Sequence, residues 1–151
     1  MKKKYTQIAA ILFAMVSMAV IAEPILAQKP FLARVRKHYQ LDRATGNCKL
    51  CHELKPREEP SAKNLNKFGT AIQSDADMKP LLGKGEDYKF SEKELDILEK
   101  VVVKHENEDS DGDGATNKEE LDLGTFPGDA TNTPEKAKLE KYRKEHPAEK
   151  K

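Results

Sequence analysis

The stretch from Cys48 to His52 constrains this chain more than any other. It reads Cys-Lys-Leu-Cys-His, and C-x-x-C-H is the attachment signature of a c-type haem. Two thiols at this spacing bond the two vinyl groups of the porphyrin, and the adjacent histidine reaches the iron from one face. Cys48 and Cys51 are the only cysteines in the sequence. The sequence therefore predicts one haem c, held by both thiols and ligated by His52.

Other uses of a C-x-x-C pair fit this sequence less well. A zinc site needs a second pair of ligands, and the chain has no third cysteine. A thioredoxin-like redox pair needs a surrounding βαβ pattern, which the sequence lacks. A disulfide between Cys48 and Cys51 stays open for an exported protein, but it gives no reason for His52. Gly46 and Asn47 are turn formers, so we expect a short helix to open at Cys48.

The N-terminal segment, residues 1–27, has the features of an export signal. Residues 2–4 are lysines, and an apolar stretch runs over residues 8–21, which is short for a membrane span of about 20 residues. Cleavage after Ala22, cleavage after Ala27 and retention as an anchor are the alternatives. Covalent haem attachment in bacteria takes place outside the inner membrane, so the signal and the C-x-x-C-H motif support each other. We expect a periplasmic or secreted protein with no stable membrane span after cleavage.

The pattern of the remaining chain is helical, and no stretch alternates as a strand does. Apolar residues recur at helical spacing over residues 30–39, 64–72 and 90–103, and Ser91 with Glu94 forms a capping box for the last of these. Residues 74–85 contain a proline and two glycines and are expected to be irregular. The predicted fold is all-α. It comprises a small c-type haem domain over 28–108, a helix-loop-helix calcium-binding segment over 109–133 and a charged C-terminal helix and tail over 134–151.

The composition limits the core and the class of partner. Charged residues are 35% of the chain and aromatic residues only 6%, so the side chains alone make a thin core that a buried haem would enlarge. The 27 basic residues nearly balance the 26 acidic ones. That balance gives no reason to expect nucleic acid as a partner.

Residues 109–120 fit the twelve-residue template of a calcium loop. Carboxylates stand at the first, third, fifth and twelfth positions, glycine at the sixth and asparagine at the ninth. Hard oxygen ligands at this spacing suit Ca²⁺, which accepts six to eight of them. The alternative is a solvated acidic loop. Because the loop is single, we expect a structural role rather than a sensor. The predicted ligands are Asp109, Asp111, Asp113, the backbone carbonyl of Ala115, Asn117 and Glu120.

The residue on the second face of the haem is left open by the sequence. Met78 lies in a loop before Lys79 and Pro80, His38 lies on the first expected helix, and His105 ends the helix that Ser91 caps. Met78 is the leading candidate, followed by His105 and His38, and the last alternative is an open site. A sixth ligand favours an electron carrier, whereas an open site permits small-ligand sensing or peroxide chemistry.

Two resemblances extend this interpretation. Cys48 to His52 resembles the motif of small mono-haem c-type cytochromes, and residues 64–72 are similar to an Asn-x-Phe/Tyr-Gly segment that follows C-x-x-C-H in small exported bacterial haem proteins. Residues 109–120, followed by Gly-Thr-Phe-Pro at 124–127, resemble thrombospondin type 3 and dockerin-like calcium loops. Many of those loops have Asp where this chain has Phe126. Together the resemblances cover residues 48–128 and imply a periplasmic electron-transfer role.

The leading hypothesis is therefore electron transfer by a single covalently bound haem c to redox partner proteins, with a structural calcium site. One alternative is a haem-based small-ligand sensor or peroxidase-like enzyme with an open distal site. Another is a calcium-dependent interaction module in which the haem is structural. The sequence contains no Ser/His/Asp set and no phosphate-binding loop, so no catalytic residue is assigned and an electron carrier is favoured over an enzyme.

Overall fold

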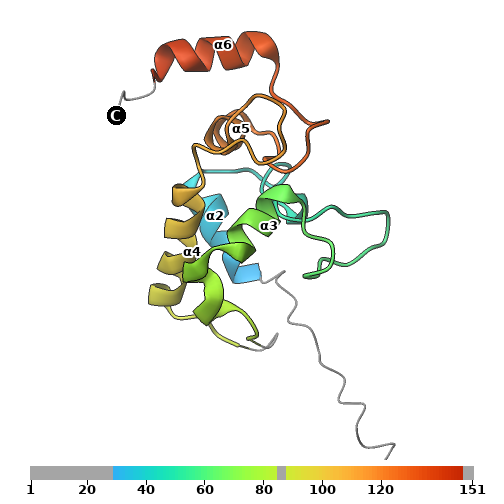
Figure 1. The fold of residues 1–151 in the computed structure, drawn as a ribbon, viewed down its shortest axis with the longest axis vertical. Helices are drawn as coiled ribbons and strands as arrows, with labels where there is room; N and C mark the ends of the chain where they lie inside the picture. Colours follow the sequence, from blue (N-terminus) through green and yellow to red (C-terminus); the bar gives the residue numbers. More distant parts are fainter. Residues whose placement is uncertain (1–28, 85–87, 148–151) are drawn as a thin grey trace, which may run out of the picture.

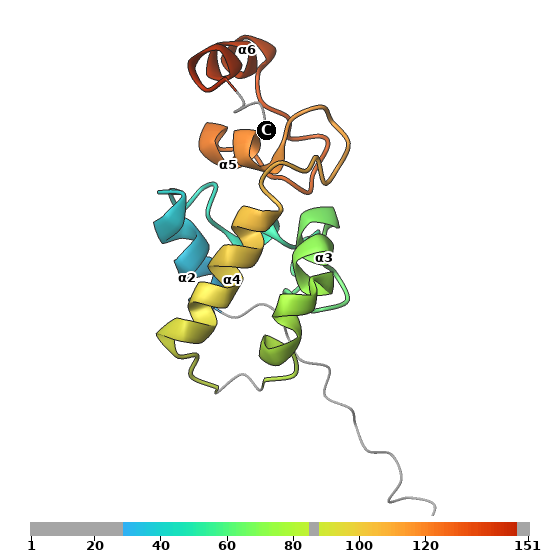
Figure 2. The ribbon, with the colours of Figure 1, turned by 60° about the vertical axis from the view of Figure 1, so that its left-hand side comes forward.

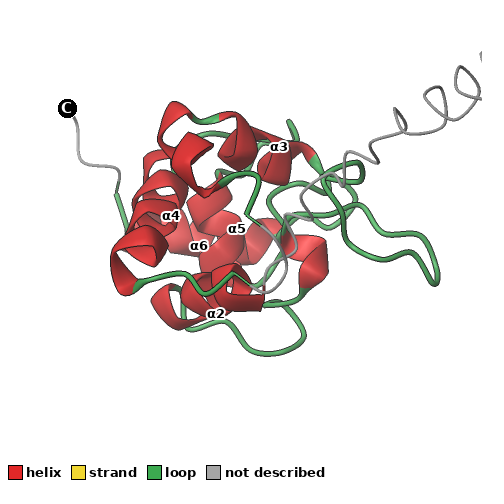
Figure 3. Ribbon diagram, turned by 90° about the horizontal axis from the view of Figure 1, so that it is seen from below, coloured by secondary structure: helices red, strands yellow, loops and turns green. Residues whose placement is uncertain are grey.

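The fold is seen in a computed structural model that describes residues 29–84 and 88–147. The export signal expected at residues 1–27 and the end of the C-terminal tail lie outside the described residues. Within them the chain forms helices joined by loops, with no strand, which confirms the all-α prediction (Figure 3). No helix in these two ranges is long and apolar enough to cross a membrane. The α-helices are α2 (Lys29–His38), α3 (Lys67–Ser74), α4 (Glu92–Lys104), α5 (Asn117–Leu123) and α6 (Lys136–Glu145), and the 3₁₀ helices are η1 (Cys48–Leu50) and η2 (Ala76–Leu81).

The core lies where α2, α3, α4 and η2 meet. Helix α4 runs between α2 on one side and α3 with η2 on the other (Figure 2). The ring of Phe31 on α2 packs against Phe90, just before α4, with ring centroids 4.6 Å apart. One buried cluster joins these elements and also takes in η1 and α5. Its members are Phe31, Val35, Leu50, Phe68, Ile72, Met78, Leu81, Leu98, Val101, Val102 and Leu121.

Local capping fixes where the helices begin and end. Ser91 accepts the amide of Glu94, and Glu94 accepts the amide of Ser91, so the predicted capping box at the start of α4 is confirmed. Thr116 and Glu119 form a second capping box for α5. Gly124 ends α5 in the left-handed conformation, with φ of 78°, a backbone geometry that glycine adopts without a steric penalty.

The segment expected to be irregular, residues 74–85, contains η2 instead. Asp75 caps this 3₁₀ helix by accepting the amide of Asp77. Pro80, one reason to expect irregular structure, lies inside η2.

Helices α5 and α6 lie together at one end of the molecule (Figure 1). Leu121 on α5 reaches the common core, whereas α6 buries no residue. The contacts of α6 are polar: the guanidinium of Arg143 donates to both carboxylate oxygens of Glu119, at 2.6 and 2.8 Å, and Tyr142 donates to Asp122. The charged C-terminal helix is therefore attached to the segment over 109–133 and not to the core.

Candidate functional site

The C-x-x-C-H motif forms a 3₁₀ turn at the edge of the core. The side chain of Asn47 caps η1 by accepting the amide of Lys49 at 2.9 Å, as the turn formers before the motif predict. Cys48 is exposed, Cys51 is partly buried, and both thiols are free. His52 is buried, with 5% of its surface exposed.

Residues 64–66 run antiparallel to the end of the motif and fix its backbone. His52 and Leu65 form an isolated bridge, the amide of Glu53 donates to the carbonyl of Asn64 at 2.8 Å, and the amide of Asn66 donates to the carbonyl of Cys51 at 3.0 Å. These bonds place the backbone of the motif against the start of α3.

The side chain of Asn66 adds a second set of bonds to the same junction. Its amide nitrogen donates to the carbonyls of Lys49 and Leu50, at 3.0 and 3.2 Å. Its amide oxygen accepts from the amide of Gly69 at 2.8 Å and so caps α3. One buried asparagine therefore holds the turn of the motif and the first turn of the next helix.

Gly69 lies inside α3, where glycine normally costs about 1 kcal/mol relative to alanine. A Cβ atom at this position would lie 2.1 Å from the carbonyl oxygen of Cys51 and 2.9 Å from its carbonyl carbon. The close approach of α3 to the motif therefore requires glycine. The neighbour that excludes a side chain here is the carbonyl of Cys51.

The imidazole of His52 is oriented by Asn64. Nδ1 of His52 lies 3.1 Å from Oδ1 of Asn64, and that oxygen also accepts the amide of Ser61 at 2.8 Å while the amide nitrogen of Asn64 donates to Glu59 at 2.8 Å. Because the Asn64 oxygen only accepts, Nδ1 of His52 is the donor and Nε2 has its lone pair free for a metal. Burial lowers the pKa of His52, so the neutral, ligating form is favoured.

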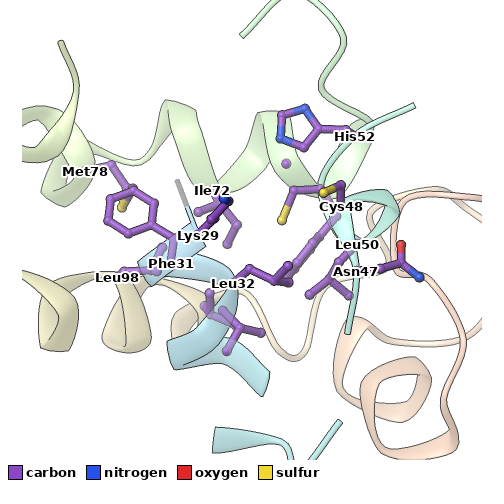
Figure 4. A pocket seen from close by; sticks show the side chains of 15 residues that line it. Lys29, Phe31, Leu32, Asn47, Cys48, Leu50, His52, Ile72, Met78 and Leu98 are labelled. Atoms are coloured by element: carbon purple, nitrogen blue, oxygen red, sulfur yellow. The ribbon is translucent and has the colours of Figure 1, made fainter. Parts of the chain in front are cut away.

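A pocket opens beside the motif and into the core. Its cavity volume is about 90 Å³, and a wider space of about 720 Å³ around it includes open solvent. Its walls are mostly apolar side chains of α2, α3 and α4. Cys48, Cys51, His52 and Met78 all line it. Figure 4 shows His52 and the cysteine sulfurs at one end and Met78 at the other, with Ile72 between them.

The three candidates for the second axial ligand lie in different places. Met78 lines the pocket and has 0% of its surface exposed. His38 is the exposed last residue of α2, and its Nδ1 lies 2.9 Å from Oε1 of Glu99 on α4. His105 lies at the end of α4 between the carboxylates of Asp75 and Glu108. Neither histidine is among the residues that line the pocket.

The thiols do not resemble a thioredoxin-like redox pair. Burial, with a smaller effect of Cys48, raises the pKa of the Cys51 thiol to about 12, so this thiol stays protonated at neutral pH. The described residues also contain no strand from which a βαβ unit could be built.

Sequence reasoning missed Lys29, Asn64 and Asn66 as site residues. Lys29 begins α2, and its side chain brings a positive charge to the rim of an otherwise apolar pocket. Asn64 and Asn66 act through His52 and through the backbone of the motif. The similarity of residues 64–72 to a haem-protein segment was the available signal for the two asparagines; nothing in the sequence singled out Lys29.

The predicted calcium loop brings its first three carboxylates together. Asp109, Asp111 and Asp113 each offer an oxygen, and these oxygens all lie within 4.8 Å of one another. The same side chains also shape the loop, since they accept backbone amides that include Gly112 at 2.7 Å and Gly114 at 3.0 Å, both onto Asp109. Both glycines have positive φ, of 83° and 96°. The glycine at the sixth position therefore makes the turn that the template predicts.

Glu120 is the most informative residue of this loop. It is fully buried, with 0% of its surface exposed, and its Oε2 has no hydrogen-bond partner. One oxygen each of Asp111 and Asp113 is also buried without a partner. Burial, together with the charges of Asp111, Asp113 and Asp109, raises the pKa of Glu120 to about 9. Buried carboxylate oxygens without donors are costly, and a cation bound among them would remove that cost.

The remaining predicted ligands have other contacts. The side-chain oxygen of Asn117 accepts the amide of Ser110 at 3.2 Å, and its nitrogen donates to the carbonyl of His105 at 2.7 Å. Asn117 therefore connects the loop to the end of α4. Its side-chain oxygen has a second lone pair that could bind a cation. Ala115 is buried, and its amide donates to Asp113 at 2.8 Å.

The acidic loop at 109–120 and the C-x-x-C-H motif are joined at the start of α3. The ammonium group of Lys67 donates to the backbone carbonyl of Asp111 at 2.8 Å. A Cβ atom on Gly128 would lie 2.3 Å from the side chain of Asn66, so the segment after α5 packs closely on the residue that holds the motif. The segments expected at 28–108 and 109–133 thus pack against each other.

The residues of the pocket fit a covalently attached haem. Two free thiols and a histidine with an available Nε2 lie at one end, a buried thioether lies at the other, and apolar walls lie between them. The loop at 109–120 fits a hard cation through its unpartnered oxygens. Comparison with known proteins adds no relative, since no family model, no curated protein and no solved structure matches this chain.

Proposed function

We propose that this protein is an exported electron carrier with a single covalently bound haem c and a structural calcium ion. The observation that supports this most is the composition of one pocket, which is lined by both cysteines of the motif, His52 and the buried Met78. Met78 is far from the motif in the sequence, and packing of η2 against α4 brings it to the same pocket. Two thiols and two candidate axial ligands are the complete protein donor set of a six-coordinate haem c.

The role of each residue follows from its chemistry. Cys48 and Cys51 would hold the haem through thioether bonds, and His52 would bind the iron through Nε2 while Asn64 holds the imidazole ring in place. Met78 would supply the second iron ligand. Lys29 would offer an ammonium group to a haem carboxylate. A bound haem supplies a one-electron iron couple.

Electron transfer is favoured over peroxide chemistry by what lines the pocket. Apart from the two thiols, His52 and Lys29 are the only titratable groups among the described residues of its lining. His52 is taken up by the iron in this proposal, so no histidine or carboxylate is left on the far side to move protons. Met78 in that place and the apolar walls instead favour a six-coordinate iron that keeps its ligands in both redox states.

Calcium is proposed as a structural ion at Asp109, Asp111, Asp113 and Glu120, with the carbonyl of Ala115 and with Asn117 as further ligands. The support is the buried, unpartnered Oε2 of Glu120 together with the cluster of three aspartates, whose charges act on the Glu120 carboxyl. The loop connects the end of α4 to the start of α5, so a cation there would stabilise the way α5 packs on the core.

The test begins with production of the exported chain together with the haem-attachment machinery. Mass spectrometry is expected to find one haem that survives acid and organic extraction. Reduced-minus-oxidised spectra are expected to show a low-spin haem that does not bind carbon monoxide. The matched control is Cys48→Ser with Cys51→Ser, which should give the mass of the unmodified chain. A protein without haem and with a disulfide between the two cysteines would overturn the proposal, and rapid carbon monoxide binding would favour the sensor or enzyme alternative.

A further inference from the structure

The segment that bears Met78 depends on support from outside itself. Helix η2 is a 3₁₀ helix of six residues, and 3₁₀ helices longer than three or four residues are uncommon because their hydrogen-bond geometry is poor. Asp75 provides the first part of the support. Its Oδ1 accepts the amide of Asp77 at 2.9 Å, and its carbonyl accepts the amide of Met78 at 3.1 Å.

The second carboxylate oxygen of Asp75 binds the end of α4. Oδ2 accepts from Nζ of Lys104 at 2.7 Å and lies 3.2 Å from Nε2 of His105. The Asp75 side chain is 4% exposed and that of His105 13%, whereas that of Lys104 is 58% exposed. These donors, led by Lys104, lower the pKa of Asp75 to about 2. Because solvent screens exposed pairs, His105 is the inner and better protected partner.

His105 also contacts the calcium loop. Its Nδ1 lies 2.7 Å from Oε2 of Glu108, the residue before Asp109. Its carbonyl accepts the side-chain amide of Asn117 at 2.7 Å, and the backbone amide of Asn117 donates to the carbonyl of Glu108 at 2.7 Å. A continuous set of bonds therefore runs from the loop through His105 and Asp75 to the backbone of Met78.

From this arrangement, and resting on the proposed haem function, we infer that Asp75 and His105 are positioning residues that hold Met78 in the pocket and couple its position to the calcium loop. Neither residue lines the pocket, so each acts through another group. This role accounts for a histidine that lies near the pocket without reaching it. It also predicts that a cation at the loop strengthens ligation by Met78.

The decisive substitution is Asp75→Asn in the haem-loaded protein. Asparagine keeps the oxygen that caps η2 but replaces Oδ2 by an amide nitrogen, which donates. Lys104 and His105, both donors, then have no acceptor at this position. Loss of a charge-assisted hydrogen bond of this kind should shift the equilibrium away from Met78 ligation roughly tenfold or more. We expect a weaker methionine–iron absorption band, a lower reduction potential and faster carbon monoxide binding.

Two controls separate positioning from general damage. Asp77→Asn changes the same helix at a side chain that is 70% exposed and 3.9 Å from Lys104, and it should leave the band and the potential unchanged. His105→Gln keeps an amide that can donate to Asp75 and should retain the band, whereas His105→Ala should weaken it as Asp75→Asn does. If His105 were itself the axial ligand, both His105 variants would change the spectrum and Met78→Leu would not.

The outcomes distinguish this inference from the proposed function. Covalent haem in every variant, found by mass spectrometry, is required by the proposed function alone. A wild-type band and potential in Asp75→Asn, with the band lost in Met78→Leu, would overturn the positioning role. Calcium chelation should weaken the band in the wild type and have little further effect in Asp75→Asn. An identical band in the wild type with and without calcium would overturn the coupling.

Discussion

Replacing Gly69 with alanine reverses the ordinary effect of that substitution in a helix. In the interior of an exposed helix, Gly→Ala stabilises a protein by about 1 kcal/mol, because alanine loses less backbone entropy on folding. In α3 the added Cβ atom would lie 2.1 Å from the carbonyl oxygen of Cys51. The expected result of Gly69→Ala is therefore a loss of stability.

The size of the loss follows from how firmly the Cys51 carbonyl is held. Real Cβ contacts are essentially never shorter than 3.0 Å. The helix α3 and the motif must therefore move apart by roughly the difference between 2.1 Å and 3.0 Å. The carbonyl of Cys51 accepts the amide of Asn66 at 3.0 Å, and this bond must lengthen as the elements move. Overpacking of a well-packed site costs about 1–3 kcal/mol. Overpacking at the upper end of this range, about 3 kcal/mol, minus the gain of about 1 kcal/mol in helix propensity gives an expected net loss of about 2 kcal/mol.

Thermal unfolding followed by circular dichroism measures this directly. For a domain of this size the melting temperature should fall by roughly 5–15 °C. The yield of covalent haem should also fall, because the motif no longer packs closely against α3. Thr70→Ala is the matched control, since Thr70 is the next residue of the same helix and is exposed; its stability should change little. A rise in melting temperature for Gly69→Ala would refute the packing argument.

Three further predictions concern the other parts of the site. Met78→Leu keeps the packing, at a cost of less than about 1.5 kcal/mol, and should abolish the methionine–iron absorption band; an unchanged band would exclude Met78 as a ligand. Calcium at a hundredfold excess over its dissociation constant should stabilise the wild type by about 2.7 kcal/mol. Calorimetry should find this gain lost in Glu120→Gln and kept in Asp122→Asn. If the wild type binds no calcium, residues 109–120 are only an acidic loop. Asn66→Asp removes the donors to the carbonyls of Lys49 and Leu50 and should lower the unfolding free energy by about 1–3 kcal/mol, measured by denaturant titration; an unaltered midpoint would remove Asn66 from the account of how the motif is held.

Features that depend on neighbouring residues were predictable from the sequence. The capping box of Ser91 and Glu94 is a local pattern, and it appears at the expected residues. The C-terminal helix expected within 134–151 begins at Lys136, and Glu135 before it makes no side-chain cap. The turn before α6 is held by Asn132, whose side-chain oxygen accepts the amide of Phe126 at 3.0 Å.

Features that depend on distant residues were not predictable in the same way. The sequence of η2 reads as irregular because its order comes from the bond between Asp75 and the end of α4, which joins residues about thirty positions apart. His105 could be proposed as an iron ligand from its residue type, whereas its carboxylate partners are visible only in the folded chain. Asn117 fits a ligand position in the template, yet in the fold its amide also connects Ser110 to the carbonyl of His105.

The haem motif and the acidic loop are connected by two consecutive residues. This connection suggests a reason for one small chain to contain both sites. Asn66 binds the turn of the haem motif, and Lys67 binds the carbonyl of Asp111 in the acidic loop. The side-chain core that these residues adjoin is small for a chain in which 35% of residues are charged. Small domains with thin cores commonly need a metal or a covalent link to remain folded. A haem on one side of Asn66 and a cation on the other would each stabilise the same junction, so loss of either is expected to loosen the contact between α3 and the motif.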